Sequence, residues 1–167
     1  MMAPDITAAM VKELRESTGG GIMDCKHALV EAGGDMEKAV AILRKSGIAK
    51  AVRRSDRATK QGVIDAYIHP GRPLGALIEL GCETDFVART EEFRTLAHEI
   101  AMHVAAMGPD RIDAVVGVDA DDEGEALLDQ AYVRDPRRTI GELIQETIAR
   151  TGENIRVTRF SRFEVGT

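Results

Sequence analysis

Residues 79–89 read Glu-Leu-Gly-Cys-Glu-Thr-Asp-Phe-Val-Ala-Arg, and they separate two stretches with different hydrophobic periodicity. Before them, residues 74–80 alternate in the way of a half-buried strand. After them, apolar residues recur at helical spacing from about 90 to 107. The stretch is therefore predicted to be a corner between a strand and a helix. Such corners run over the surface and often carry function.

The corner places large apolar side chains beside an acid. Phe86 and Val87 directly follow Thr84 and Asp85. Two interpretations remain open from the residues alone. In the ordinary one the aromatic ring packs back under its own loop and has no function, since scattered apolar side chains are normal near a protein surface. Alternatively, it is kept for the pocket of a partner.

The chain before residue 50 has the pattern of three short helices joined by glycine turns. Asp5 or Thr7 can cap the first helix, Asp35 caps the third, and Gly47 is a plausible C-cap of the third. The inward positions are expected to be Ile6, Ala9, Met10, Leu14, Ala28, Leu29, Ala32, Met36, Ala39, Val40 and Leu43. A bundle of this size is marginal by itself, so we expect it to be followed by a second core.

Beyond residue 61 the pattern changes to strands and longer helices. Residues 62–80 predict a β-hairpin around the turn Pro70-Gly71-Arg72-Pro73, with Ile64, Ala66 and Ile68 on one face of its first strand. The best helix in the chain should lie across this hairpin. Its apolar stripe is Phe93, Leu96, Ala97, Ile100, Ala101, Val104 and Met107.

The last third predicts one more helix and one more strand. Residues 127–133 fit either a short helix or extended chain, and Asp135-Pro136 is predicted to be a turn. Thr139 with Glu142 has the spacing of a capping box, and Gly152 should end that helix. Residues 153–165 should form a strand with a bulge between Val157 and Phe160. The predicted fold class is α+β: a three-helix bundle, then a small antiparallel sheet with helices packed on one face.

Composition restricts the functional classes. The net charge of −6 argues against a general nucleic-acid binder, and no apolar run reaches transmembrane length. The chain start lacks a signal-peptide pattern, and Cys25 and Cys82 form no C-x-x-C motif, so we expect a reducing, cytoplasmic location. Residues 44–60 carry seven Lys or Arg against one acid, which is typical of a solvated basic linker, whereas residues 112–126 are acidic and ambiguous.

Three patterns that could suggest an active site are better explained otherwise. Residues 19–26 lack the Gly-Lys-Ser/Thr ending of a phosphate-binding loop. His98 and His103 are five residues apart and point about 140° apart around a helix, so they cannot share one metal ion. Asp24 is better explained as a helix cap than as a catalytic acid. No nucleophile, base and oxyanion site can be assembled, so we expect no enzyme.

Three stretches together resemble the elongation factor Ts family in its short form. They are Thr84-Asp85-Phe86-Val87-Ala88-Arg89, the run from Leu14 to Leu29, and Gly152-Glu153-Asn154-Ile155 followed by Arg159-Phe160. They occur in the order of the family. The resemblance extends over residues 3–107 and 127–166 and is poorest at 108–126.

The resemblance implies a domain organisation and a function. The N-terminal domain, 1–54, would be similar to a ubiquitin-associated (UBA-like) three-helix domain. A basic linker, 55–61, would lead to an α+β core and dimerisation domain, 62–167. Members promote GDP release from the GTPase EF-Tu during translation elongation by disturbing its Mg²⁺ and phosphate site. The alternative is a non-catalytic binding or scaffold module that uses the three-helix bundle.

The resemblance also implies which residues contact EF-Tu. Those that would displace its Mg²⁺ are Thr84, Asp85, Phe86 and Val87, with Asp85 and Phe86 as the wedge. Those of a second, N-terminal contact are Arg15, Ile22 and Met23. The family needs no cofactor or metal of its own, and we expect no direct binding of nucleotide, membrane or specific nucleic acid.

The chain departs from the family pattern in ways that bear on assembly. Gly81 stands where Asn is usual and could loosen the corner, and Ile22 stands where a Met is common. The chain lacks the second core half of long members and a helical hairpin after about residue 125. Short members typically dimerise, so we expect a homodimer formed through the exposed edge of the C-terminal strand.

Overall fold

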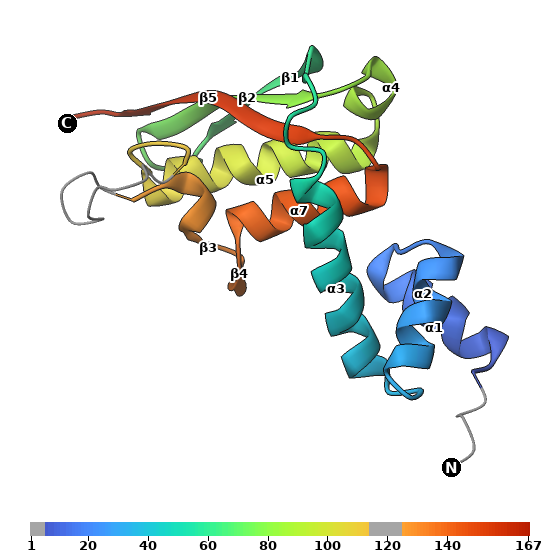
Figure 1. The fold of residues 1–167 in the computed structure, drawn as a ribbon. Helices are drawn as coiled ribbons and strands as arrows, with labels where there is room; N and C mark the ends of the chain where they lie inside the picture. Colours follow the sequence, from blue (N-terminus) through green and yellow to red (C-terminus); the bar gives the residue numbers. More distant parts are fainter. Residues whose placement is uncertain (1–5, 114–124) are drawn as a thin grey trace, which may run out of the picture.

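The computed structural model describes residues 6–113 and 125–167. Asp5 and most of the ambiguous acidic stretch 112–126 lie outside the described residues. The described part is α+β, as predicted: helices at the N-terminal end, then a small antiparallel sheet with helices on one face (Figure 1). Within it, no helix combines the length and apolar character needed to cross a lipid bilayer.

The first three helices are α1 (Ala8–Thr18), α2 (Ile22–Glu31) and α3 (Met36–Val52). The Thr7 hydroxyl caps α1 by accepting the N–H of Met10 at 3.3 Å, and Asp35 caps α3 by accepting that of Lys38 at 3.0 Å. The buried residues of the bundle are Leu14, Cys25, Ala28, Leu29 and Ala39. Ala9 and Val40, predicted to face inward, are exposed, because each lies one position, or about 100°, from a residue that packs inward.

The prediction that Gly47 ends the third helix is wrong. The helix continues to Val52, and Gly47 is buried inside it. A Cβ at Gly47 would lie 3.1 Å from the Cβ of Ala149 in α7 (Ile140–Thr151). The missing side chain lets α3 pack closely against α7, so this glycine serves a close helix contact rather than a helix end.

The sheet contains β1 (Gln61–Ile68), β2 (Leu74–Cys82) and β5 (Ile155–Glu164), all antiparallel, in the order β1-β2-β5. Leu80 pairs with Val63 on one side and Val157 on the other. Glu79 then pairs with Arg159, which leaves Thr158 as the extra residue of the bulge predicted in this strand.

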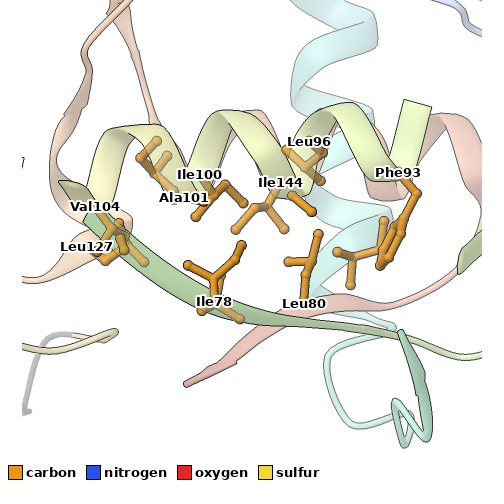
Figure 2. Packing of buried hydrophobic residues seen from close by; sticks show 14 of the residues in the cluster. Ile78, Leu80, Phe93, Leu96, Ile100, Ala101, Val104, Leu127 and Ile144 are labelled. Carbon is orange, nitrogen blue, oxygen red and sulfur yellow. The ribbon is translucent and has the colours of Figure 1, made fainter. Parts of the chain in front are cut away.

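One face of the sheet carries the main core (Figure 2). Helix α5 (Glu91–Met107) lies along it, with Phe93 and Ile100 fully buried against Ile78 and Leu80 of β2. Ile144 from α7 enters the same cluster. The predicted helix across the hairpin is therefore confirmed. Each large side chain buried here contributes about 1.5–3 kcal/mol to folding.

The segment before α7 is a 3₁₀ turn, η1 (Leu127–Asp129), and two short strands, β3 (Ala131–Tyr132) and β4 (Asp135–Thr139). The turn lies at 133–134, so the predicted turn at Asp135-Pro136 is wrong. These residues begin β4 instead, where a proline is tolerated at a strand end. The capping box of Thr139 and Glu142 starts α7 and Gly152 ends it, as predicted.

Candidate functional site

The corner after β2 forms a single helical turn, α4 (Asp85–Ala88). Thr84 is its N-cap, with its hydroxyl 3.5 Å from the N–H of Val87. Val87 packs against the core, whereas the Phe86 side chain is 80% exposed. The ring therefore does not fold back under its own loop. Asp85 stays half-buried at the surface, with its carboxylate 2.9 Å from the guanidinium of Arg89.

Glu153, in the turn between α7 and β5, holds this corner from behind. One carboxylate oxygen accepts the backbone N–H groups of Glu83 and Thr84 at 3.1 and 3.0 Å. The other accepts the Thr84 hydroxyl at 2.5 Å. A partly buried carboxylate that accepts three hydrogen bonds fixes the backbone just before α4. The direction in which Phe86 points therefore depends on a residue of the C-terminal segment.

Asn154, the next residue, ties the basic linker to the same corner. Its buried amide donates to the carbonyls of Ser55 and Arg57 at 3.2 and 2.7 Å. Its backbone N–H donates to the Glu83 carboxylate at 2.7 Å, and Arg57 lies 3.5 Å from the same carboxylate. Glu153 and Asn154 belong to the third family motif, but the sequence alone does not indicate what they contact. The Gly-Glu-Asn run directly after a helix was the available signal.

Two neighbours of the corner are closely packed. Burial, together with the negative charge of Glu153, raises the pKa of the Cys82 thiol to about 11. Gly81 is buried, and a Cβ there would lie 3.0 Å from the Thr59 hydroxyl. Thr59 thus fills the space that a side chain at position 81 would use, which argues against a loose corner.

The predicted N-terminal contact forms a second surface. Arg15 is exposed near the end of α1, and Ile22 and Met23 begin α2 with 57% and 58% of their surface exposed. Asp24 does not act as a cap, because Gly21 occupies the cap position and the Asp24 carboxylate instead pairs with Lys50 at 2.9 Å. Figure 1 shows α4 and the α1–α2 pair on the same side of the molecule, with the C-terminal end of α7 between them.

The two histidines of α5 have separate structural environments. His98 lies at the surface, with Nδ1 3.0 Å from the Asp65 carboxylate. His103 is fully buried, and its Nδ1 accepts the N–H of Val133 at 3.2 Å. Its Nε2 therefore carries the hydrogen and donates to the amide oxygen of Gln130 at 2.9 Å. Burial lowers the pKa of His103, so this imidazole is a neutral structural link between α5 and the segment after η1.

The sheet has an apolar face turned away from α5, which we call the outer sheet face. Its exposed apolar members are Ile64, Ile68, Leu77 and Phe163. Ile68 and Phe163 flank Gly75, which pairs with both of them across β1, β2 and β5. The alternation predicted in the first strand is therefore present, with its isoleucines outward. Exposed fractions of 65% for Ile64, 76% for Ile68 and 71% for Phe163 are unusual for a strand face that stays in water.

Comparison with known proteins gives a consistent result over nearly the whole chain. The family model described as Elongation factor TS matches residues 6–122. Elongation factor Ts of Thermoanaerobacter sp. (strain X514) is 44% identical over 194 aligned positions, which cover 96% of this chain and 95% of that protein. Elongation factor Ts of Fervidobacterium nodosum is 43% identical, with 97% of this chain and 99% of that protein covered.

The length of these alignments bears on the shortened core. An alignment of 194 positions exceeds the 167 residues of this chain, so the relative carries residues without a counterpart here. This agrees with the expectation that a segment present in short members is missing. The match nevertheless includes the corner and the N-terminal contact. By the family model and by the identity to these relatives, the chain belongs to the elongation factor Ts family and is a factor of translation elongation.

Proposed function

We propose that the chain is a guanine-nucleotide exchange factor that binds EF-Tu·GDP and promotes the release of GDP. The observation that carries this proposal is Phe86, an aromatic side chain 80% exposed on a one-turn helix whose N-terminal side is fixed by three hydrogen bonds to Glu153. A ring that is rigidly presented but not used in its own core suits insertion between elements of a partner.

The energetics require more than this ring. A thousandfold faster release needs about 4 kcal/mol of barrier lowering. Burial of one Phe side chain supplies about 1.5–3 kcal/mol. The second contact of Ile22 and Met23, both more than half exposed, is the source we propose for the remainder. Asp85, beside the ring, adds a negative charge suited to disturbing a bound Mg²⁺ and its ligands.

In this role the chain makes and breaks no covalent bond and needs no cofactor. GTPases hold the nucleotide through Mg²⁺, a lysine and backbone N–H groups, so a small displacement of the phosphate loop weakens several contacts together. The effect is reciprocal: the chain weakens the binding of GDP to EF-Tu by the same ratio by which GDP weakens the binding of the chain to EF-Tu. We expect this cycle to operate in the cytoplasm, where translation elongation takes place.

The test is the release of a fluorescent GDP analogue from EF-Tu, measured with and without the chain. The wild-type chain should accelerate release, and Phe86→Ala should lose about 10- to 150-fold of that acceleration, the equivalent of burying one Phe. Met107→Ala is the control, because Met107 is a large, 45% exposed side chain at the far end of α5 from the corner. A wild-type chain that binds EF-Tu without accelerating release would favour the scaffold alternative.

We also propose that the chain forms a homodimer, and that the contact is the outer sheet face rather than the edge of β5. Both are available in the described part of the chain, since β5 is an edge strand. The face is favoured because each of its three strands contributes at least one exposed, large apolar side chain, beside the Glu79–Arg159 ion pair that lies on the same face. Two such faces packed together would remove Ile64, Ile68 and Phe163 of each copy from water, in the manner of a two-sheet sandwich.

Sedimentation at micromolar concentration tests this proposal. The wild-type chain should have the mass of a dimer, and Phe163→Asp should be a monomer, because a buried unpaired carboxylate opposes the contact. Met107→Asp is the control, because Met107 is an exposed apolar side chain of α5, on the opposite side of the sheet, and this variant should stay dimeric. A monomeric wild-type chain would refute the dimer, and a dimeric Phe163→Asp variant would refute this face.

A further inference from the structure

Arg150, in the last turn of α7, touches both the Gly19 turn, which lies between Arg15 and Ile22, and the start of α5. Its aliphatic stem covers the turn between α1 and α2: a Cβ at Gly19 would lie 2.5 Å from the Arg150 Cδ and 3.0 Å from its Cγ. Its guanidinium forms an ion pair with Glu92 in the first turn of α5. Glu92 is three residues beyond Arg89, which pairs with Asp85 of the corner.

The residues that follow Arg150 contact the corner itself. Glu153 accepts the backbone N–H groups of Glu83 and Thr84, as described above. A single short segment, 150–154, therefore touches the turn before Ile22 and Met23 and also the backbone before Phe86. Figure 1 shows this end of α7 between the two surfaces.

Helix α3 also joins the bundle to α7, at Gly47, which packs against Ala149 directly before Arg150, and nearer the start of α7. Arg44 of α3 pairs with Glu142 at 2.5 Å, near the start of α7. Glu142 and Arg150 are eight residues apart, or about 12 Å along the helix. These contacts place α3 on α7, whereas Arg150 is the side chain that would collide with a Cβ on the Gly19 turn itself.

We propose that Arg150 is a positioning residue that holds the N-terminal contact at a fixed separation from the Phe86 corner, so that both engage one EF-Tu molecule together. This inference rests on the proposed exchange function. Two linked contacts act as one only when their spacing matches the partner, since the second then binds at a high effective concentration. A fixed spacing also lowers the entropy lost on binding.

Three substitutions separate the two halves of this contact. Arg150→Ala removes both the stem on Gly19 and the pair with Glu92, and it should lower the GDP release rate at saturating factor about tenfold. Arg150→Met keeps an apolar stem and should lie between Arg150→Ala and wild type. Arg150→Lys keeps stem and charge and should restore most of the rate. Because the Arg150 side chain is 36% exposed, the melting temperature of each variant should stay within about 3 °C of wild type.

Arg138→Ala is the matched control. Arg138 is a partly exposed arginine that pairs with Glu146 of α7 at 2.7 Å, and it contacts neither the Gly19 turn nor the corner. A second measurement reports the coupling directly, through the losses caused by Met23→Ala and Phe86→Ala. In the wild-type background, the double variant Met23→Ala/Phe86→Ala should show a smaller fold-loss in GDP release rate than the product of the fold-losses of the two single variants. In the Arg150→Ala background the losses should multiply.

The outcomes separate the two proposals. A wild-type chain that does not accelerate release overturns the exchange function itself. An active wild-type chain with an unchanged Arg150→Ala variant overturns the positioning role alone. If Arg150→Ala and Arg138→Ala lower the release rate equally, Arg150 makes only an ordinary structural contribution and the positioning role is overturned. The same conclusion follows if the fold-losses of Met23→Ala and Phe86→Ala multiply in both backgrounds.

Discussion

Replacing Glu153 by Ala is the sharpest test of how the corner is held. The substitution removes the acceptor of three hydrogen bonds, from the N–H groups of Glu83 and Thr84 and from the Thr84 hydroxyl. These groups are partly buried, so solvent replaces the lost bonds only in part. The substitution leaves the core cluster around Phe93 untouched.

The expected loss follows from those three bonds. Hydrogen bonds to a charged acceptor contribute up to about 3 kcal/mol each, but these three share one partly exposed side chain, so about 1 kcal/mol each is appropriate. Glu153→Ala should therefore lower the free energy of unfolding by about 3 kcal/mol. For a chain of this size, that is a decrease of about 6–12 °C in melting temperature. Glu153→Gln keeps an acceptor for both N–H groups and should cost about 1 kcal/mol.

Urea denaturation and calorimetry measure these differences. Glu146→Ala is the matched control. Glu146 of α7 forms an ion pair with Arg138, and its loss should lower the free energy of unfolding by less than about 1 kcal/mol. Glu153→Ala should also slow GDP release more than Glu146→Ala does. Equal destabilisation by the two substitutions would refute the idea that Glu153 fixes the corner.

Three further predictions concern the rest of the fold. Burial lowers the pKa of His103, so the unfolded chain protonates this imidazole more readily than the folded chain does. The stability that neutral His103 contributes is therefore complete above its ordinary pKa of 6.5 and falls as the pH decreases below it. The difference in urea midpoint between wild type and His103→Gln should accordingly shrink from pH 8 to pH 5. Gly47→Val should cost about 1–3 kcal/mol in urea denaturation by pushing α3 from α7, whereas Ala49→Val, exposed on the same helix, should cost under 1 kcal/mol. Cys82, buried with a pKa of about 11, should react with a thiol reagent at pH 8 only after denaturation, and rapid labelling of the native chain would contradict its burial.

Much of the fold could be predicted because its signals are local. Thr7, Asp35 and the Thr139–Glu142 capping box each act within three residues of the helix that they start, so their spacing is visible in the chain. The bulge in β5 was visible as a slip in alternation. Gly47 was misassigned because glycine at a helix end and glycine at a helix contact look alike until Ala149 is placed beside it.

The residues of the candidate site also fall into those that the sequence indicates and those that only the structure brings together. The residues of the corner and of the N-terminal contact were named from family motifs, and the structure places Phe86, Ile22 and Met23 at the surface. Glu153 is separated from Thr84 by 69 residues, and Arg150 from Glu92 by 58. Hydropathy patterns and capping rules carry no information over such separations.

The sequence by itself determined the order and type of the helices and the main strands, the place of the corner and the family. Tertiary structure decided that the isoleucines of β1 face outward, that Glu153 holds the backbone before Phe86, and that Arg150 lies between two distant surfaces. The physical reason is range. Helix capping and side-chain periodicity act within a few residues, whereas these contacts arise only when α7 packs against α3 and α5 and brings its end to the corner.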